Sequence, residues 1–231
     1  MKIDVLTLFP GMFEAVLGDS VIGRAVEKGL LHLRYINIRD FSEDKHKRVD
    51  DYPYGAGGGM VMAPQPIYNA WKSITEPLDY KPHVIYMSPQ GQVFSQGKAK
   101  SLATEYDHLI LLCGHYEGVD ERILEEIVDE EISIGDYVLT GGEIPAMAII
   151  DAVARMVPGT VQHGNTESES HSDGLLEYPQ YTRPPEFMGR KVPEILLSGH
   201  QAKIAEWRRQ KSLERTREKR PDLLKERKEN E

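Results

Sequence analysis

The segment ISIGDYVLTGGEIP, residues Ile132–Pro145, is the most informative stretch of this 231-residue chain for its fold. An apolar strand pattern breaks at Gly135, resumes at Tyr137, and breaks again at Gly141 and Gly142, directly before a predicted helix. Glycine permits tight turns and Pro145 suits the first turn of a helix. Two turns this close together predict a pocket built from main-chain groups. A second glycine-edged segment, LLCGHYEGVDER (111–122), suggests that two such loops hold one ligand.

The rest of the chain alternates between strand and helix patterns. Strands are expected at 3–8, 31–38, 84–87 and 109–113, and helical spacing at 13–26, 67–74 and 147–157. This alternation predicts an α/β fold with a mainly parallel sheet. Ligands of such sheets bind beyond the carboxyl ends of the strands, where Ser88, Pro89, Gly114 and Gly135 are expected.

Composition narrows the class of protein. Cys113 is the only cysteine, so the chain has no internal disulfide, and its apolar neighbours predict a buried thiol. The chain lacks an apolar run of about 18 residues, and its start reads as a strand rather than a signal peptide. We therefore expect a cytoplasmic protein without a membrane span.

Charge is segregated along the chain, whose net charge is −9. Residues 1–198 hold 17 basic and 30 acidic residues, whereas residues 199–231 hold 11 basic and 7 acidic ones. The basic carboxyl-terminal segment can therefore present a positively charged face that binds the phosphates of a nucleic acid.

Three parts are expected: an α/β domain over 1–160, a flexible interdomain linker over 161–175, and a helical basic domain over 176–231. The last part contains a predicted helix at 200–220, with Ile204, Trp207 and Leu213 as its buried stripe. The aromatic and basic segment 178–191 suits either stacking on unpaired bases or ordinary packing.

The sequence lacks the motifs of several common catalytic and nucleotide-binding sites. The run Gly55–Gly59 fits neither a phosphate-binding loop nor a dinucleotide fingerprint, so it is a surface loop or a place for close substrate approach. Zinc-ligand spacing and a serine-hydrolase elbow are absent from the sequence. The polar linker offers possible acid–base groups, or simply solvated side chains: Glu167, Glu169, His171, Asp173 and Glu177. Arg155 either pairs with Asp151 along a helix or holds negative charge on a substrate oxygen.

Several long motifs, taken together and in order, resemble one family. They are LFPGMF (8–13), GRAVEKGLL (23–31), VDDYPYGAGGGMVM (49–62), SPQG (88–91), CGHYEGVDER (113–122), SIGDYVLTGGEIPAM (133–147), YPQYTRP (178–184), VPEILLSGH (192–200) and RRQKSLERTREKRPDLL (208–224). The chain resembles the bacterial tRNA (guanine-N1)-methyltransferases, the TrmD family of the SPOUT superfamily.

The resemblance implies a SPOUT-type α/β fold with a deep trefoil knot and a small helical carboxyl-terminal domain that binds tRNA. It implies a homodimer with active sites at the subunit interface, and methyl transfer from S-adenosylmethionine to N1 of the guanine at tRNA position 37. The residues that match the family's cofactor site are Tyr86, Met87, Ser88, Pro89, Gly114, Tyr116, Glu117, Gly118, Ile134, Gly135, Asp136, Tyr137, Val138, Leu139, Gly141, Gly142 and Pro145.

The resemblance also implies two catalytic residues. Arg155 matches an arginine that steadies the guanine O6. Glu169 stands where the family has an aspartate that removes the N1 proton, with Asp173 as the nearest rival. A magnesium requirement is implied as well, without assignable ligands.

Overall fold

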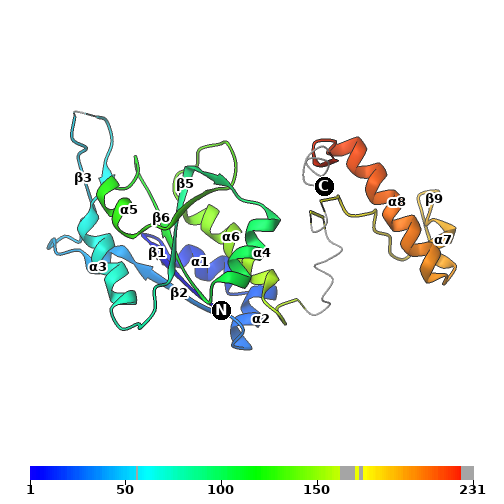
Figure 1. Cartoon of the computed structure of the whole chain (residues 1–231), viewed down its shortest axis with the longest axis horizontal. Helices are drawn as coiled ribbons and strands as arrows, with labels where there is room; N and C mark the ends of the chain where they lie inside the picture. The colour runs from blue at the N-terminus through cyan, green and yellow to red at the C-terminus, as the bar shows by residue number, and fades with distance from the viewer. Residues whose placement is uncertain (56, 162–169, 172–173, 225–231) are drawn as a thin grey trace. The chain divides into compact units, whose positions relative to one another are not determined.

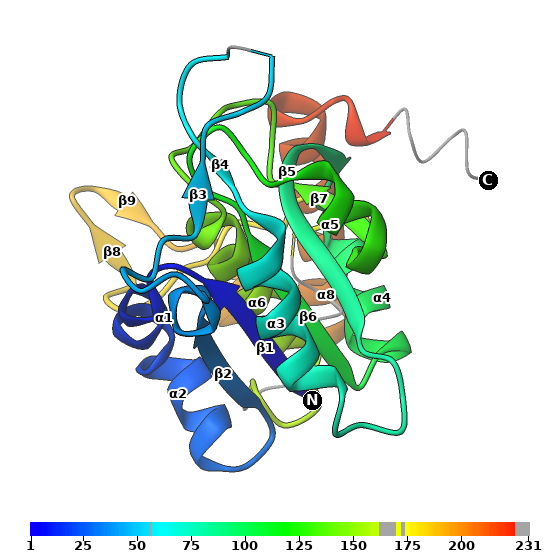
Figure 2. The ribbon, with the colours of Figure 1, turned by 90° about the vertical axis from the view of Figure 1, so that its left-hand side faces the viewer.

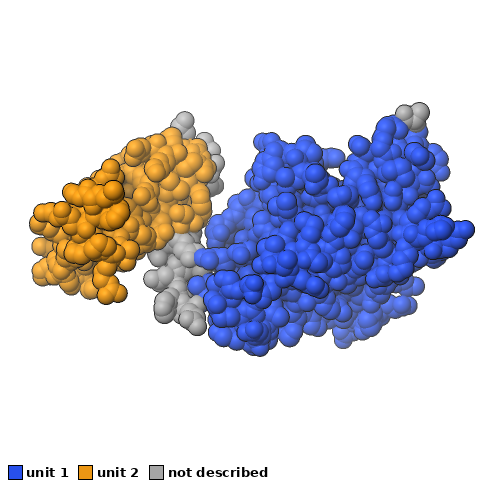
Figure 3. All heavy atoms as spheres, turned by 180° about the vertical axis from the view of Figure 1, so that it is seen from behind, with its two compact units in different colours: residues 1–163 blue, residues 164–231 orange. Residues whose placement is uncertain are grey.

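A computed structural model describes residues 1–55, 57–161, 170–171 and 174–224 of the chain. The chain divides into two compact units, Met1–His163 and Gly164–Glu231 (Figure 3). The linker residues Glu169 and Asp173 lie outside the described residues.

The first unit is built around a five-stranded sheet in the order β2-β1-β6-β5-β7. Every neighbouring pair in this sheet is parallel, which confirms the predicted mainly parallel α/β architecture. The strands are β1 (Lys2–Thr7), β2 (His32–Asn37), β5 (His83–Val93), β6 (His108–Cys113) and β7 (Glu130–Ser133).

Helices cover both faces of the sheet (Figure 1). One face packs against α1 (Pro10–Leu17), α2 (Ser20–Glu27), α4 (Gln96–Glu105) and α6 (Glu143–Met156). The other packs against α3 (Pro64–Thr75), α5 (Glu121–Ile127) and the 3-10 helix η1 (Ile38–Phe41), and Figure 2 looks onto this side. Because side chains alternate along a strand, β6 sends Leu109 and Leu111 into the first core and Ile110 and Leu112 into the second. Cys113 is fully buried in the first core, as expected, and burial raises the pKa of its thiol well above the usual value.

Two boundaries differ from the sequence expectation. The predicted helix over 13–26 is two helices, because the chain turns at Gly18 and Ser20 takes a φ of +59°. The strand expected to stop before Ser88 and Pro89 instead continues to Val93. The pairing with β7 absorbs the extra residues, since Met87 and Gln92 both pair with Ile132. Residues 88–91 therefore bulge out of the sheet.

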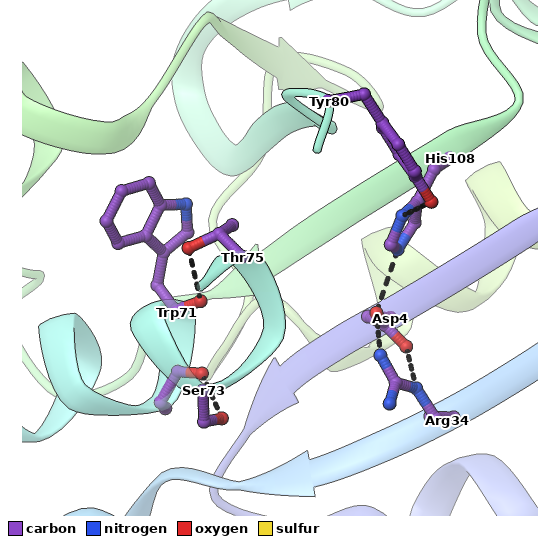
Figure 4. Close-up of polar contacts among 8 residues, drawn as sticks. Asp4, Arg34, Trp71, Ser73, Thr75, Tyr80 and His108 are labelled. Atoms are coloured by element: carbon purple, nitrogen blue, oxygen red, sulfur yellow. Dashed lines mark hydrogen bonds and ion pairs between the residues drawn. The ribbon is translucent and has the colours of Figure 1, made fainter. Parts of the chain in front are cut away.

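A polar network around the buried side chains of Asp4 and His108 joins the strands on the α3 face (Figure 4). Asp4 is 1% exposed and accepts from Arg34 Nε at 2.6 Å and from Arg34 Nη2 at 2.5 Å. His108 Nε2 lies 2.8 Å from Asp4 Oδ2, and Tyr80 Oη lies 3.1 Å from His108 Nδ1. The buried carboxylate is thus fully engaged, as burial of a charge requires.

A short hairpin of β3 (Asp50–Asp51) and β4 (Val61–Met62) flanks the sheet and carries the glycine-rich loop between its strands. It is tied to the loop after β6, because Met62 donates its N–H to the Gly118 carbonyl at 2.9 Å.

The second unit contains the hairpin β8 (Glu186–Phe187) and β9 (Arg190–Lys191), the short α7 (Glu194–Leu197) and the long α8 (Gln201–Lys219). Thr216 is fully buried, and its hydroxyl accepts the N–H of Leu176 at 2.9 Å. Ile204 is buried as predicted, whereas Trp207 and Leu213 are half-buried. None of the described helices in either unit is long and apolar enough to cross a membrane.

Candidate active site

A cavity of about 380 Å³ opens at the bulge of β5 and at the ends of β6 and β7. Three loops enclose it: the bulge at 88–91, the loop after β6, and the segment 134–142 that leads into α6. This is the carboxyl edge of a parallel sheet, where ligands of open α/β folds bind. The structure brings together all of the sequence-predicted cofactor residues except Asp136, which lies outside the lining.

The last of these loops is fixed by backbone contacts. Gly135 has a φ of +146°, a backbone conformation that residues with a side chain rarely adopt. It also packs against the ring of Tyr137. The Ser133 hydroxyl accepts the Gly135 N–H at 3.1 Å. Gly142 packs so closely that an added Cβ would lie 2.8 Å from Cys113 Cα and 3.0 Å from Met87 Cβ. The cavity wall is therefore main chain at the points where the sequence placed glycine.

The loop after β6 contributes more polar groups. Tyr116 adopts a φ of +62°, and its hydroxyl accepts from Arg39 Nη2 at 3.4 Å. Glu117 donates its N–H to the Met60 carbonyl at 3.0 Å. Behind this loop, burial and then the nearby carboxylates of Glu131 and Glu121 raise the pKa of Tyr86 to about 12, so its phenol stays neutral.

Sequence reasoning missed a polar group behind the wall. Glu143 is 3% exposed, and its Oε1 accepts from the Thr7 hydroxyl at 2.8 Å. Its Oε2 lies 3.9 Å from His115 Nδ1, a buried atom without a hydrogen-bond partner among the described residues. These side chains also border a smaller cavity of about 190 Å³, lined by Phe9, Met12, His115, Thr140, Gly141, Glu143 and Ile144. Three distant segments meet here, so no local motif could signal the group.

The predicted catalytic residues lie elsewhere. Arg155 is half-buried in the last turn of α6 and does not line the larger cavity. It follows Glu143 by twelve residues, a helical rise of about 18 Å. Glu169 and its rival Asp173 fall outside the described residues. Among the described residues, no cluster of three or more His, Cys, Asp or Glu side chains could hold a metal ion.

A parallel α/β sheet with a cavity of glycine-rich loops at its carboxyl edge defines a ligand-binding protein of the open α/β class. Comparison with known proteins narrows this class. The family described as tRNA (Guanine-1)-methyltransferase TrmD matches residues 1–226, and the chain belongs to this family.

Individual relatives agree with the family match. The chain is 63% identical over 225 residues to the tRNA (guanine-N(1)-)-methyltransferase of Ruminiclostridium cellulolyticum, covering 97% of this chain and 96% of that protein. The enzyme of the same name from Alkaliphilus oremlandii is 58% identical, with 97% of this chain and 92% of that protein covered. The enzyme of the same name from Halalkalibacterium halodurans is 56% identical, with 99% and 93% covered.

Proposed function

We propose that this protein is a tRNA methyltransferase that transfers the methyl group of S-adenosylmethionine to N1 of the guanine at tRNA position 37. The observation that carries the proposal is the glycine-walled cavity at the bulge of β5 and the ends of β6 and β7, in a chain that matches the methyltransferase family over residues 1–226.

The cavity has the character that a cofactor of this size and polarity needs. Its volume of about 380 Å³ falls in the range of small-molecule sites. At Gly135, Gly141 and Gly142 an added Cβ would lie within 2.8 Å of a neighbouring protein atom, so the close packing of this wall depends on glycine. We assign cofactor binding to the predicted residues that line the cavity, whereas Asp136 lies outside the lining and stays a prediction from the resemblance. When bound, S-adenosylmethionine supplies an electrophilic methyl group.

Guanine N1 carries a proton at neutral pH, so methylation there requires a base. We assign this role to Glu169, with Asp173 as the alternative. The resemblance aligns Glu169 with the aspartate that acts as the general base in the family. Deprotonation spreads negative charge onto the guanine O6, and Arg155 is assigned to hold that charge.

We further propose a homodimer in which each active site uses residues of both subunits. The rise of α6 carries Arg155 about 15 Å along the helix from Pro145, the α6 residue in the cavity wall, which supports a role in the neighbouring subunit's site. Phe9, Met12, Val16 and Ile144 are 39–60% exposed on α1, the residue before it and the start of α6. Such apolar exposure suits a subunit interface.

A trefoil knot at the cavity belongs to the same proposal. Residues 134–142 pass close to two other loops: Gly142 donates its N–H to the Gly114 carbonyl at 2.9 Å, and Gly141 forms an isolated bridge with His115. These contacts supply the tight packing that a knotted crossing requires.

The second unit is proposed to be the tRNA-binding domain, spanning 176–231 after a linker over 161–175. Its aromatic segment is partly committed to internal packing, since Arg208 lies 4.8 Å from the centroid of Tyr178 and Trp207 packs near Tyr181. Phe187 remains 66% exposed beside Arg190 and Lys191, as stacking on an unpaired base requires.

A tRNA substrate supports a cytoplasmic location. Magnesium dependence stays an expectation from the resemblance, because the described residues offer no suitable ligand cluster, and we derive no step through a metal.

Titration calorimetry with S-adenosylmethionine tests the proposal against its rival, a non-catalytic RNA-binding protein. We expect saturable binding of one cofactor per cavity. A lack of binding at millimolar cofactor, with tRNA binding intact, would favour the rival.

A further inference from the structure

We propose that the loop Asp44–Arg48 of the first unit is a contact surface for the phosphate backbone of the tRNA substrate. The inference rests on the function proposed above and adds a surface to it, on the unit that holds the cavity rather than on the basic carboxyl-terminal helix.

The loop is an exception in the charge of its unit. Residues 1–163 contain 14 Lys and Arg against 24 Asp and Glu, which by itself disfavours a polyanion. Within this acidic unit Lys45, His46, Lys47 and Arg48 are consecutive, and all four are exposed. Two carboxylates beside the run offset part of this charge, because Arg48 pairs with Asp44 and Lys47 pairs with Asp40.

Hydrogen bonds hold the loop in one conformation. The carboxylate of Asp44 accepts the N–H of His46 at 2.8 Å and Arg48 Nη2 at 2.9 Å. Lys47 donates its N–H to the Asp44 carbonyl at 2.8 Å, and the Ser42 hydroxyl donates to the Arg48 carbonyl. The basic side chains are thereby displayed on an ordered backbone, which lowers the entropy lost on binding.

Two of these basic side chains, Lys45 and Lys47, are not held by strong contacts within the described part of the chain. Lys47 Nζ pairs with Asp40 at 2.7 Å, and both side chains are largely exposed, so this pair contributes little to stability and can open. Lys45 makes no hydrogen bond or ion pair with any residue that the structure describes. Lys45 and Lys47 are therefore the two ammonium groups best able to meet phosphates.

The loop lies at the same edge of the sheet as the cavity. It follows β2 and η1, and all five strands are parallel, so the carboxyl end of β2 faces the same way as those of β5, β6 and β7. Two strand spacings separate β2 from β6, or about 10 Å.

Contacts on both sides tie the loop to the cavity. Before the loop, Arg39 donates to the hydroxyl of Tyr116, which lines the cavity. After it, Asp50 pairs with Met62, whose N–H is bonded to Gly118. A nucleic acid whose target base lies beside the cofactor cavity therefore has this basic loop within reach of its backbone.

The test compares the full-length double variant Lys45→Gln/Lys47→Gln with a matched control, Lys28→Gln/Lys100→Gln. The control removes the same charge from exposed positions at the end of α2 and on α4. Equilibrium binding of an unmodified tRNA transcript is measured across a salt series, together with S-adenosylmethionine binding. Lys45→Gln alone is also measured, because that side chain supports no described contact.

We expect the loop variant to bind tRNA more weakly than wild type and to lower the slope of log affinity against log salt by about 2, one unit per lost phosphate contact. Cofactor affinity and the control should match wild type, and Lys45→Gln should show about half the change in slope. A wild-type slope in both loop variants, or an equal loss in the control, would overturn the inference. Failure of the wild type to bind tRNA would instead refute the proposed function.

Discussion

The backbone N–H of Gly142 donates a hydrogen bond to the carbonyl oxygen of Gly114 across 2.9 Å. This bond joins the start of α6 to the loop after β6, two segments that are 28 positions apart in the sequence. The neighbouring bridge between His115 and Gly141 extends the contact. One wall of the cavity is thus a main-chain junction.

We expect Gly142→Ala to destabilise the protein and weaken cofactor binding. The new methyl group would lie 2.8 Å from Cys113 Cα, and backbone atoms cannot move aside as a flexible side chain does. Overpacking of this kind costs about 1–3 kcal/mol of unfolding free energy. Urea denaturation and cofactor calorimetry measure the two effects.

The matched control is Gly97→Ala on α4, where the added Cβ meets only the Ser95 hydroxyl at 3.7 Å. This control should keep wild-type cofactor affinity. Equal behaviour of the two variants would show that the junction is not constrained as described.

Glu169→Gln tests the proposed base. The amide keeps the size of the side chain but cannot accept the N1 proton, so turnover should fall by about 10²–10⁴-fold, the usual contribution of a general base. Cofactor affinity should be unchanged, since Glu169 is assigned no cofactor contact. Asp173→Asn is the parallel variant. A loss of turnover in Asp173→Asn, with near-normal rates in Glu169→Gln, would transfer the role to Asp173.

Mixing two inactive variants tests whether the sites are shared between subunits. Gly142→Val distorts the cavity wall of one subunit, because the new side chain would meet Cys113 and Met87, and Glu169→Gln removes the base of the other. After random subunit exchange we expect recovery to about a quarter of wild-type activity, because half of the dimers are mixed and one of their two sites is intact. An absence of recovery, with exchange verified by mass spectrometry, would show that Glu169 acts in the cavity of its own subunit.

The conformation of the loop Asp44–Arg48 should depend on pH through the carboxyl group of Asp44. The side chain of Arg48 and then the backbone N–H of His46 lower the pKa of the Asp44 carboxyl to about 2. Because this folded-state pKa is depressed, the stabilisation of the loop is fully present above the ordinary value of about 3.9 and is lost as the pH falls towards 2. Carbon NMR titration of the carboxyl carbon should show the low pKa, and Arg48→Gln should raise it. An ordinary pKa in wild type would contradict the described loop.

Much of the fold was predictable because the central strands are buried on both faces. Continuous apolar runs such as Leu109–Cys113 need such burial, and the helices between them supply it. The bulge at 88–91 was not predictable, since Ser88 and Pro89 ordinarily end a strand and only the pairing with Ile132 reveals the continuation. The break at Gly18 was hidden because apolar residues keep helical spacing across it.

The cavity wall was predictable where conformation demands glycine, as at Gly135 and Gly142. The buried carboxylate of Glu143 was not predictable from the sequence. Glu143 reads in sequence as a favourable residue for a helix start, yet its side chain turns inward to Thr7, 136 positions away. Local patterns carry no information on such pairings.

The most direct test of the proposed function uses purified protein, isotope-labelled S-adenosylmethionine and two tRNA transcripts, one with guanine and one with adenine at position 37. Nucleoside mass spectrometry then locates the label. We predict 1-methylguanine from the first transcript only. Absence of label from the first transcript, or equal labelling of guanine in the second, would contradict it.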